Sequence, residues 1–236
     1  MNSYMDKRIF VLIPSRGGSK GVPRKALKPL GNKPLIAHTI DYALELGGRT
    51  KVHVNTDDAE IQDVACSLGA DIPFLRPEEL ARDDSDLVEA VKHASLWYRQ
   101  HQDYVYDIII IMSPTYPFRR PGLVRDALVR GLDDPGIFNI GSVGPVSQDI
   151  RNYWQMGEHG PCRYMIPGAH EIKQEDLIQS SLSFNIVYEF RENNHLRTPV
   201  ILNDIEAIDI DEPEDLERAR AVVGAGLYPF PAGMHE

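Results

Sequence analysis

The chain has 236 residues, enough for one large α/β domain or a domain with a sizeable insertion, and its 42% hydrophobic content can fill a core. The net charge of −10 disfavours nucleic-acid binding, and the longest strongly apolar runs, five residues each, are far shorter than the ~20 residues of a membrane helix. We therefore expect neither nucleic acid nor membrane as a partner. The charged, Gly-rich sequence after the first apolar run is unlike a secretory signal, which predicts a cytoplasmic location.

Hydrophobic periodicity predicts alternating strands and helices along most of the chain. The expected strands cover residues 9–13, 52–56, 72–75, 108–112, 138–143, 184–190 and 205–210, and the expected helices cover 34–46, 58–68, 85–101, 121–132 and 213–223. Residues 108–112 are apolar at every position, as in a parallel strand that is covered on both faces. The alternation predicts a three-layer α/β/α domain with a mostly parallel sheet.

Between residues 144 and 184 this alternation gives way to Pro, Gly and mixed polar residues. Tyr153, Trp154, Tyr164 and Met165 are large apolar groups that a lone projecting segment would leave exposed. We interpret 144–184 as an arm inserted in a single domain that spans residues 1–236, and we expect the arm to contact the partner subunit of a homodimer. An arm folded back on its own domain is the alternative.

The first segment with chemical content is 14–25, which reads PSRGGSKGVPRK and follows the first expected strand. Glycines such as Gly17 and Gly18 permit positive φ and let backbone N–H groups approach an anion, while Arg16 and Lys25 supply positive charge. The segment matches neither a Walker A loop nor a GxGxxG fingerprint. Because ligands of open α/β sheets bind at the carboxyl ends of strands, we interpret it as a triphosphate-binding loop. A flexible surface loop with solvated charges is the alternative.

A second segment, 208–216, reads IDIDEPEDL and runs from an expected strand into an expected helix. Residues i and i+2 of a strand point the same way, so Asp209 and Asp211 are expected to present two carboxylates on one face. Such hard oxygen ligands suit Mg²⁺ that bridges to phosphates. The alternative is that Asp211 caps the following helix, which leaves Asp209 unexplained.

Residues 14–25 resemble the nucleotide-binding motif of the CMP-sialic acid synthetases, or acylneuraminate cytidylyltransferases, which typically reads ARGGSKGIPxKN. The resemblance continues in order through LKPLGNKPLI from residue 27, NTDD from residue 55 and FLRPEELA from residue 74. It covers residues 1–120 well and returns at Asp209-Ile210-Asp211. Several ordered motifs are more specific than any one of them. The resemblance implies a Rossmann-like, three-layer α/β/α nucleotidyltransferase fold.

The resemblance also implies roles for individual residues. The expected nucleotide-binding residues are Arg16, Gly17, Gly18, Ser19, Lys25, Arg76 and Ser85, and the expected catalytic residues are Arg16, Lys25, Asp209 and Asp211. Within these sets the loop residues would contact the CTP phosphates, and the two aspartates would hold Mg²⁺. Arg76 and Ser85 would lie near the cytosine, although a surface salt bridge for Arg76 and a helix N-cap for Ser85 are equally open.

Three positions depart from the family pattern. Ala26 stands where the family usually has Asn, which removes a hydrogen bond expected near the triphosphate. Ser113 stands where the family has a Gln that faces the sugar, so a reshaped sugar pocket is expected. Lys173 is a candidate for the arginine that holds the sugar carboxylate, but a solvated lysine is the favoured interpretation.

The implied reaction is attack of the anomeric hydroxyl of a nine-carbon acidic sugar on the α-phosphate of CTP, which gives a CMP-sugar and pyrophosphate. Two alternatives stay open at this point. One is an enzyme of the same fold that uses another nucleotide or sugar. The other is a non-catalytic nucleotide-binding paralogue, which the intact pair of aspartates disfavours.

Overall fold

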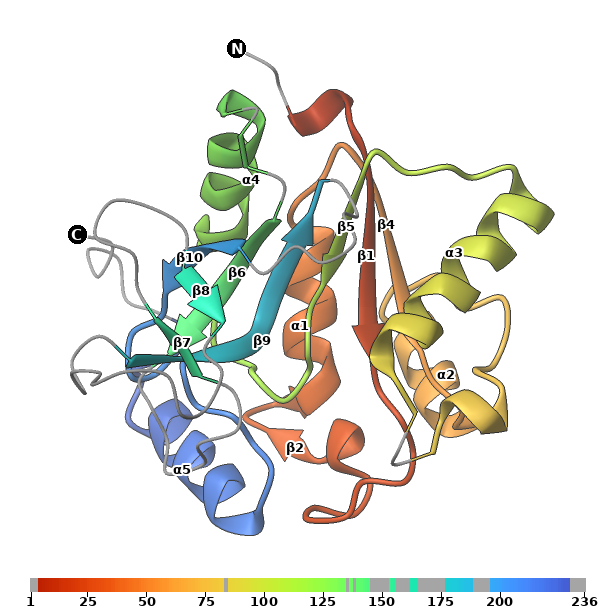
Figure 1. Ribbon diagram of the computed structural model, residues 1–236. Coiled ribbons are helices and arrows are strands. Elements are labelled where there is room, and N and C mark those ends of the chain that lie inside the picture. Colours follow the sequence, from red (N-terminus) through yellow and green to blue (C-terminus); the bar gives the residue numbers. More distant parts are fainter. Residues whose placement is uncertain are drawn as a thin grey trace.

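The computed structural model describes residues 4–82, 85–134, 136–137, 139–144, 153–155, 162–164, 177–188 and 196–229. Within this part of the chain the main sheet is 8-stranded, in the order β4-β1-β5-β9-β6-β10-β8-β7 (Figure 1). The strands are β1 (Arg8–Pro14), β4 (Arg49–Asn55), β5 (Ile108–Ile111), β6 (Asn139–Gly144), β7 (Tyr153–Gln155), β8 (Cys162–Tyr164), β9 (Leu177–Val187) and β10 (Leu196–Ile201), with a small separate hairpin of β2 (Pro29–Leu30) and β3 (Lys33–Pro34).

Most of the central strands run parallel. β1 pairs in parallel with β4 and β5, and β6 pairs in parallel with β10. β9 is inserted antiparallel between β5 and β6. The expected α/β fold with a mostly parallel sheet is therefore confirmed.

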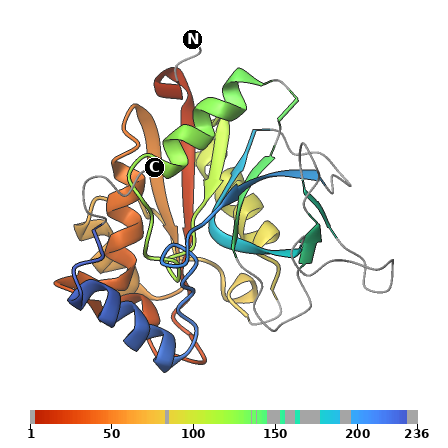
Figure 2. The same cartoon turned by 90° about the vertical axis from the view of Figure 1, so that its left-hand side faces the viewer.

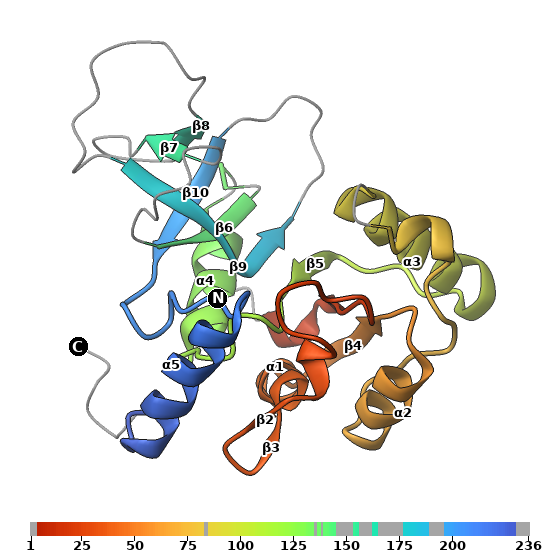
Figure 3. The same cartoon turned by 90° about the horizontal axis from the view of Figure 1, so that it is seen from below.

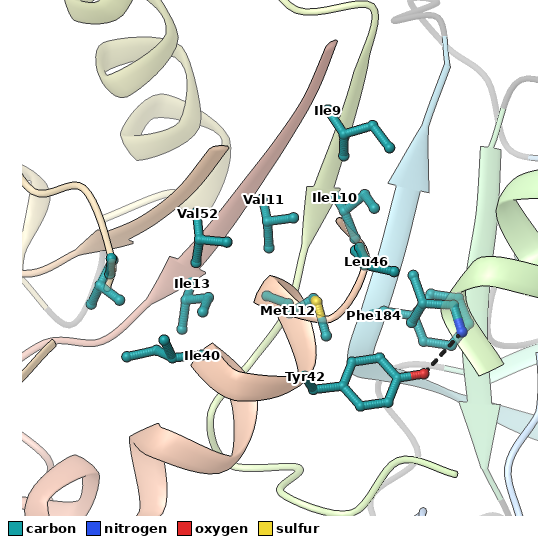
Figure 4. Close-up of a cluster of buried hydrophobic side chains, with 14 of the residues drawn as sticks. Ile9, Val11, Ile13, Ile40, Tyr42, Leu46, Val52, Ile110, Met112 and Phe184 are labelled. Atoms are coloured by element: carbon teal, nitrogen blue, oxygen red, sulfur yellow. Dashed lines mark hydrogen bonds between the residues drawn. The ribbon is translucent and has the colours of Figure 1, made fainter. Parts of the chain in front are cut away.

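Helices cover both faces of this sheet. They are α1 (Leu35–Leu44), α2 (Ala59–Ser67), α3 (Leu87–Gln102), α4 (Leu123–Asp133) and α5 (Pro213–Gly224), with short 3-10 turns η1 (Tyr4–Asp6), η2 (Lys25–Leu27) and η3 (Glu78–Leu80). Alternate residues of β1 point to opposite faces: Val11 packs with α1, α2 and α4, and Leu12 packs with α3. Figure 1 shows α4 and α3 on opposite sides of the sheet, and Figure 4 shows the cluster around Val11, Ile40 and Ile110.

Two expected strands are wrong. Residues 72–75 form no strand, which agrees with the shortness of this segment and with the prolines Pro73 and Pro77. Residues 205–210 also form no strand, because the segment begins with a turn in which the Asn203 side chain accepts hydrogen bonds from the backbone N–H groups of Ile205 and Glu206. The sequence analysis also missed β10, which contains Pro199.

The expected arm is in part an extension of the sheet. β9 begins at Leu177, inside the predicted arm, and pairs with β7, which pairs with β8. β8 in turn pairs antiparallel with β10. Figure 2 shows these teal and blue strands on the side of the molecule away from β4 and α1. Met165 lies outside the described residues.

Among the described helices, none combines the length and the apolar character that crossing a membrane requires.

His53 on β4 is fully buried in an aromatic layer between the sheet and α3. Its ring stacks 5.9 Å from Phe10 and lies 5.0 Å from Phe74. Its Nδ1 lies 2.9 Å from the Asp71 carbonyl oxygen, which can only accept, so this nitrogen carries a proton and donates. Burial lowers the pKa of His53 from 6.5 to about 4, partly opposed by the contact with the Asp71 carbonyl.

We predict that this histidine destabilises the protein in mild acid. Because its pKa is lowered on folding, the unfolded chain takes up the proton first, and stability falls as the pH drops from 6.5 towards about 4. Between pH 7 and pH 5 this amounts to about 2 kcal/mol. Urea unfolding should show that this part of the pH dependence disappears in His53→Phe and persists in His101→Asn, a change at an exposed histidine. An identical slope in His53→Phe would refute the prediction.

Candidate active site

A cavity of about 970 Å³ lies beyond the carboxyl ends of β1 and β5, at the end of the sheet seen in Figure 3. Its described walls come from five parts of the chain: 14–26, Leu35, residues 76–82 with 85–90, 113–116 and 209–212. The sequence-predicted residues that line it are Arg16, Ser19, Lys25, Arg76, Ser85, Ser113, Asp209 and Asp211. Gly17 and Gly18 belong to the same loop but do not line the cavity, and Lys173 lies outside the described residues.

The start of the loop after β1 is fastened to the end of β4. The backbone N–H of Ser15 donates to the Asn55 carbonyl at 3.0 Å, and that of Gly17 donates to Asp57 Oδ1 at 2.9 Å. Neither Gly17 nor Gly18 uses the positive φ that a glycine permits. Gly17 is needed for close packing instead, because a Cβ there would lie 2.7 Å from the Asp58 carboxylate.

The far end of the loop is fastened by Arg24, which has positive φ (53°). Its guanidinium lies 3.1 Å from Asp58 Oδ1 and 2.8 Å from Glu60 Oε2. Asp58 also caps α2 by accepting hydrogen bonds from the backbone N–H groups of Glu60 and Ile61. The NTDD segment therefore positions the loop, a role that its sequence alone did not reveal.

Lys25 joins the loop to the C-terminal part of the chain. Its Nζ donates to the Ile210 carbonyl at 2.5 Å and to Asp211 Oδ1 at 2.8 Å. The Lys25 side chain is only 12% exposed, whereas that of Asp211 is 67% exposed. A cation is thus held between the loop and the aspartate pair.

Asp209 and Asp211 both line the cavity, but they do not stand on a strand as expected. The segment is held by one backbone hydrogen bond, from the Ile210 N–H to the Thr115 carbonyl at 2.9 Å. Asp211 does not cap α5, because Glu212 occupies the N-cap position and Asp215 accepts from the backbone N–H groups of Asp211 and Glu212. The capping alternative is therefore wrong.

The two carboxylates have different surroundings. Burial raises the pKa of Asp209, as does the charge of Asp211, while the Thr115 and Tyr116 side chains and Lys25 oppose this rise. Within the described part of the chain, Asp209 Oδ1 is buried and has no hydrogen-bond partner. No third His, Cys, Asp or Glu in that part completes a metal-binding group with them. Two carboxylates, one with an unsatisfied buried oxygen, fit Mg²⁺, which commonly takes one or two protein carboxylates together with substrate phosphates.

Arg76 is buried, which excludes the surface salt bridge considered for it. Its Nε donates to Asn55 Oδ1 at 2.9 Å, and its Nη2 donates to the Asn55 carbonyl. Burial lowers the pKa of Arg76, with a smaller lowering by the charge of Arg16 and an opposing effect of Asp57. Arg76 therefore brings a second positive charge close to Arg16 at the cavity wall.

Ser85 is not the N-cap of α3, because Asp86 holds that position and accepts from the Val88 N–H. The Ser85 hydroxyl donates to the backbone carbonyl of Arg82 at 2.5 Å and lies 3.0 Å from that of Leu80. Ala26, the position where the family usually has Asn, is buried and lines the cavity.

Ser113 is fixed by neighbours that the sequence analysis did not single out. Its hydroxyl lies 2.9 Å from Thr115 Oγ1, and its carbonyl accepts from Arg119 Nη2 at 2.8 Å. Arg119 is fully buried and also donates to the Ser183 carbonyl on β9 at 2.6 Å. Burial lowers the pKa of Arg119 to about 10, so it is charged at neutral pH. A buried arginine thus ties the Ser113 loop to β9.

Gly21 lies so close to the backbone of the 209–212 segment that only a residue without a side chain fits there. A Cβ at this position would lie 2.2 Å from the Asp211 carbonyl oxygen and 2.8 Å from Glu212 Oε1. Real Cβ atoms do not approach a backbone oxygen so closely, so a side chain here would push the loop and the 209–212 segment apart.

The chain is similar to known cytidylyltransferases. A family model described as cytidylyltransferase matches residues 10–119. A CMP-N,N'-diacetyllegionaminic acid synthase from Legionella pneumophila is 33% identical over 231 residues, covering 88% of this chain and 93% of that protein. A pseudaminic acid cytidylyltransferase from Campylobacter jejuni is 27% identical over 219 residues, covering 89% of this chain and 93% of that protein.

Solved structures show the same fold. A CMP:2-keto-3-deoxy-manno-octonic acid synthetase, solved in complex with CTP, superposes with a TM-score of 0.72 over 93% of this chain and 100% of that chain. Its sequence is only 17% identical, so the similarity concerns the fold alone.

We predict that Gly21→Ala destabilises the protein by about 1–3 kcal/mol, as overpacking does elsewhere. Gly18→Ala is the matched control, because a Cβ at Gly18 meets nothing within 4 Å, and it should stay within about 0.5 kcal/mol of the unchanged protein. Urea unfolding at neutral pH measures both. Equal stabilities for the two variants would show that the loop does not press against Asp211.

Proposed function

Because this chain belongs to the CMP-sialic acid synthetase family of cytidylyltransferases, we propose that it joins the cytidylyl group of CTP to a nine-carbon acidic sugar. The chain is a nucleotidyltransferase. The observation that carries the proposal is the 33% identity over 88% of the chain to a synthase named for a nine-carbon acidic sugar. The cavity supports it, because it gathers the loop and the aspartate pair, which are far apart in the sequence, around one space.

In the proposed reaction the anomeric hydroxyl of the sugar attacks the α-phosphate of CTP, the bond to the bridging oxygen of the β-phosphate breaks, and pyrophosphate leaves. Arg16, Ser19 and Lys25 would hold the triphosphate, and the charges of Arg16 and Lys25 would stabilise the leaving group. Arg76 and Ser85 would lie near the cytosine, from the wall formed by 76–90. The chain's task is positioning and charge stabilisation, with no covalent enzyme intermediate.

Asp209 and Asp211 would hold Mg²⁺, the cofactor that we propose. When bound, Mg²⁺ would place positive charge at the α-phosphate. Asp209 would be fixed by the Thr115 and Tyr116 side chains around it, and Asp211 by its backbone contact with Asp215. This division gives the metal one rigid buried ligand and one exposed ligand.

The sugar is proposed from the relatives and the cavity together. Two relatives that span most of this chain are named for legionaminic and pseudaminic acid. Ser113 lines the cavity and is shorter than the Gln usual in the family, which leaves more room beside the sugar. Lys173 stays a prediction for the sugar carboxylate, as does the cytoplasmic location.

We predict that the purified protein releases pyrophosphate from CTP, in the presence of Mg²⁺, with a nine-carbon 2-keto acid sugar as the acceptor. ATP, GTP and UTP are the nucleotide controls, and a deoxyoctulosonic acid is the acceptor control. Faster release with the eight-carbon acid, or with another nucleotide, would favour a same-fold enzyme of different specificity. No release with any pair would favour the non-catalytic alternative.

Variants of the aspartates complete this experiment. Asp209→Ala and Asp211→Ala should each lower pyrophosphate release more than tenfold, which corresponds to about 1.4 kcal/mol of barrier. Glu214→Ala is the matched control, because Glu214 is an exposed carboxylate at the start of α5 that does not line the cavity. A variant that keeps more than about a tenth of the activity removes that aspartate from the catalytic site.

We also propose that the enzyme is a homodimer with two-fold symmetry, in which the 144–184 arm of one subunit reaches the partner's sugar pocket. The sequence supports this, because Tyr153, Trp154 and Tyr164 lie in the arm. β7 and β8 pair with β9 and β10 of the same chain, so the arm would reach the partner from a base that belongs to its own sheet.

Light scattering at micromolar concentration should therefore give a dimer. Gly144 and Gln179 are paired across β6 and β9, so a short turn can join Gly144 to Leu177 and remove 145–176. We expect this deletion to yield a monomer. A monomeric full chain would refute the dimer, and a dimeric deletion variant would refute the role of the arm.

A further inference from the structure

A lysine joins the phosphate loop to the proposed metal site. Lys25 Nζ lies 2.8 Å from Asp211 Oδ1 and 2.5 Å from the Ile210 carbonyl. The lysine side chain is only 12% exposed, so the ammonium is enclosed where the two segments meet. A positive charge thus neutralises the exposed carboxylate of the proposed metal pair.

We propose that Lys25 takes the place of the divalent cation at Asp211 when no nucleotide is bound, and so makes metal binding conditional on the nucleotide. This inference rests on the proposed function, which assigns Asp211 to the metal. It adds a role for Lys25 before the reaction begins, in addition to contact with the phosphates.

Electrostatics gives the reason. An ammonium and a divalent cation near the same carboxylate repel each other, and the ammonium at 2.8 Å already satisfies Oδ1. A bound triphosphate adds several negative charges, which can balance both cations at once. Without the triphosphate, Lys25 and the metal compete for Asp211. With it, the lysine donors can turn to the phosphate oxygens.

The loop geometry gives Lys25 a defined position for this role. Lys25 begins η2, directly after Arg24, whose positive φ and ion pair with Asp58 set the direction of the chain. The Lys28 N–H donates to the Lys25 carbonyl and closes the turn. Lys25 therefore starts from a rigid turn, and its side chain alone needs to move between Asp211 and the nucleotide.

The test measures Mn²⁺ binding to the full chain in the absence of other metals and of nucleotide. Free Mn²⁺ is detected by its electron paramagnetic resonance signal. Lys25→Gln removes the charge and keeps a donor for the Ile210 carbonyl, and Lys25→Met removes both. We expect either variant to bind Mn²⁺ at least about tenfold more tightly than the unchanged protein, because the competing positive charge is removed. The gain is limited to this order because Asp211 is exposed and solvent screens the charge of Lys25. Lys25→Arg keeps the charge and should bind as the unchanged protein does.

A second charge-removing variant controls for net charge. Lys28→Met, which removes the same charge at a residue that does not line the cavity, should change Mn²⁺ affinity by less than about twofold. Circular dichroism confirms that each variant is folded. If Lys25→Gln and Lys25→Met bind Mn²⁺ no more tightly than the unchanged protein, or no more tightly than Lys28→Met, the inference is overturned.

The double variant Lys25→Gln with Asp211→Asn distinguishes failure of the proposed role of Lys25 from failure of the assignment of the metal to Asp211. If Lys25→Gln gains no affinity and its Mn²⁺ binding is lost with Asp211→Asn, the metal site stands and only the role of Lys25 is refuted. If Mn²⁺ binding to Lys25→Gln does not depend on Asp211, the assignment of the metal to this carboxylate is refuted, and the inference with it.

Discussion

The site depends on how the short 209–212 segment is held without a strand. On one side Lys25 Nζ donates to the Ile210 carbonyl, and on the other the Ile210 N–H donates to the Thr115 carbonyl. One residue between the two aspartates therefore anchors to both the phosphate loop and the loop after β5. Gly21 makes this arrangement possible, because the Asp211 carbonyl lies next to the position that a Cβ atom would occupy in any other residue.

The unequal surroundings of the two aspartates follow from the same arrangement. Asp209 faces inward to the side chains of Thr115 and Tyr116, and Asp211 faces solvent and Lys25. The cavity has nearly balanced charge, because among the described residues five cationic and four anionic side chains line it: Arg16, Lys20, Lys25, Arg76 and Arg82, and Asp86, Asp209, Asp211 and Glu212. Because the cation offsets part of the negative charge of the triphosphate, such a site takes up both with a smaller change in net charge than it would take up the triphosphate alone.

Much of the fold was predictable because its signals are local. The apolar run at 108–112 predicted a buried strand, and the periodicity of 34–46 predicted α1. The cavity residues of the loop and the aspartate pair were predictable because ordered motifs carry them. The missed features depend on hydrogen bonds between separate segments. Arg76 donates to Asn55, Arg119 donates to the Ser183 carbonyl, and the Ile210 N–H donates to the Thr115 carbonyl. No pattern within one segment encodes such pairs, and the alternation that favoured a strand at 205–210 was misleading.

The contact between Lys25 and residues 210–211 spans 185 to 186 positions of the chain. During synthesis the loop after β1 therefore emerges well before its partner. β1 and β4 can pair and pack on α1 long before then, because their contacts are close in sequence. The core can therefore form ahead of the active site, and the growing chain cannot complete this site until residues 210 and 211 have left the ribosome.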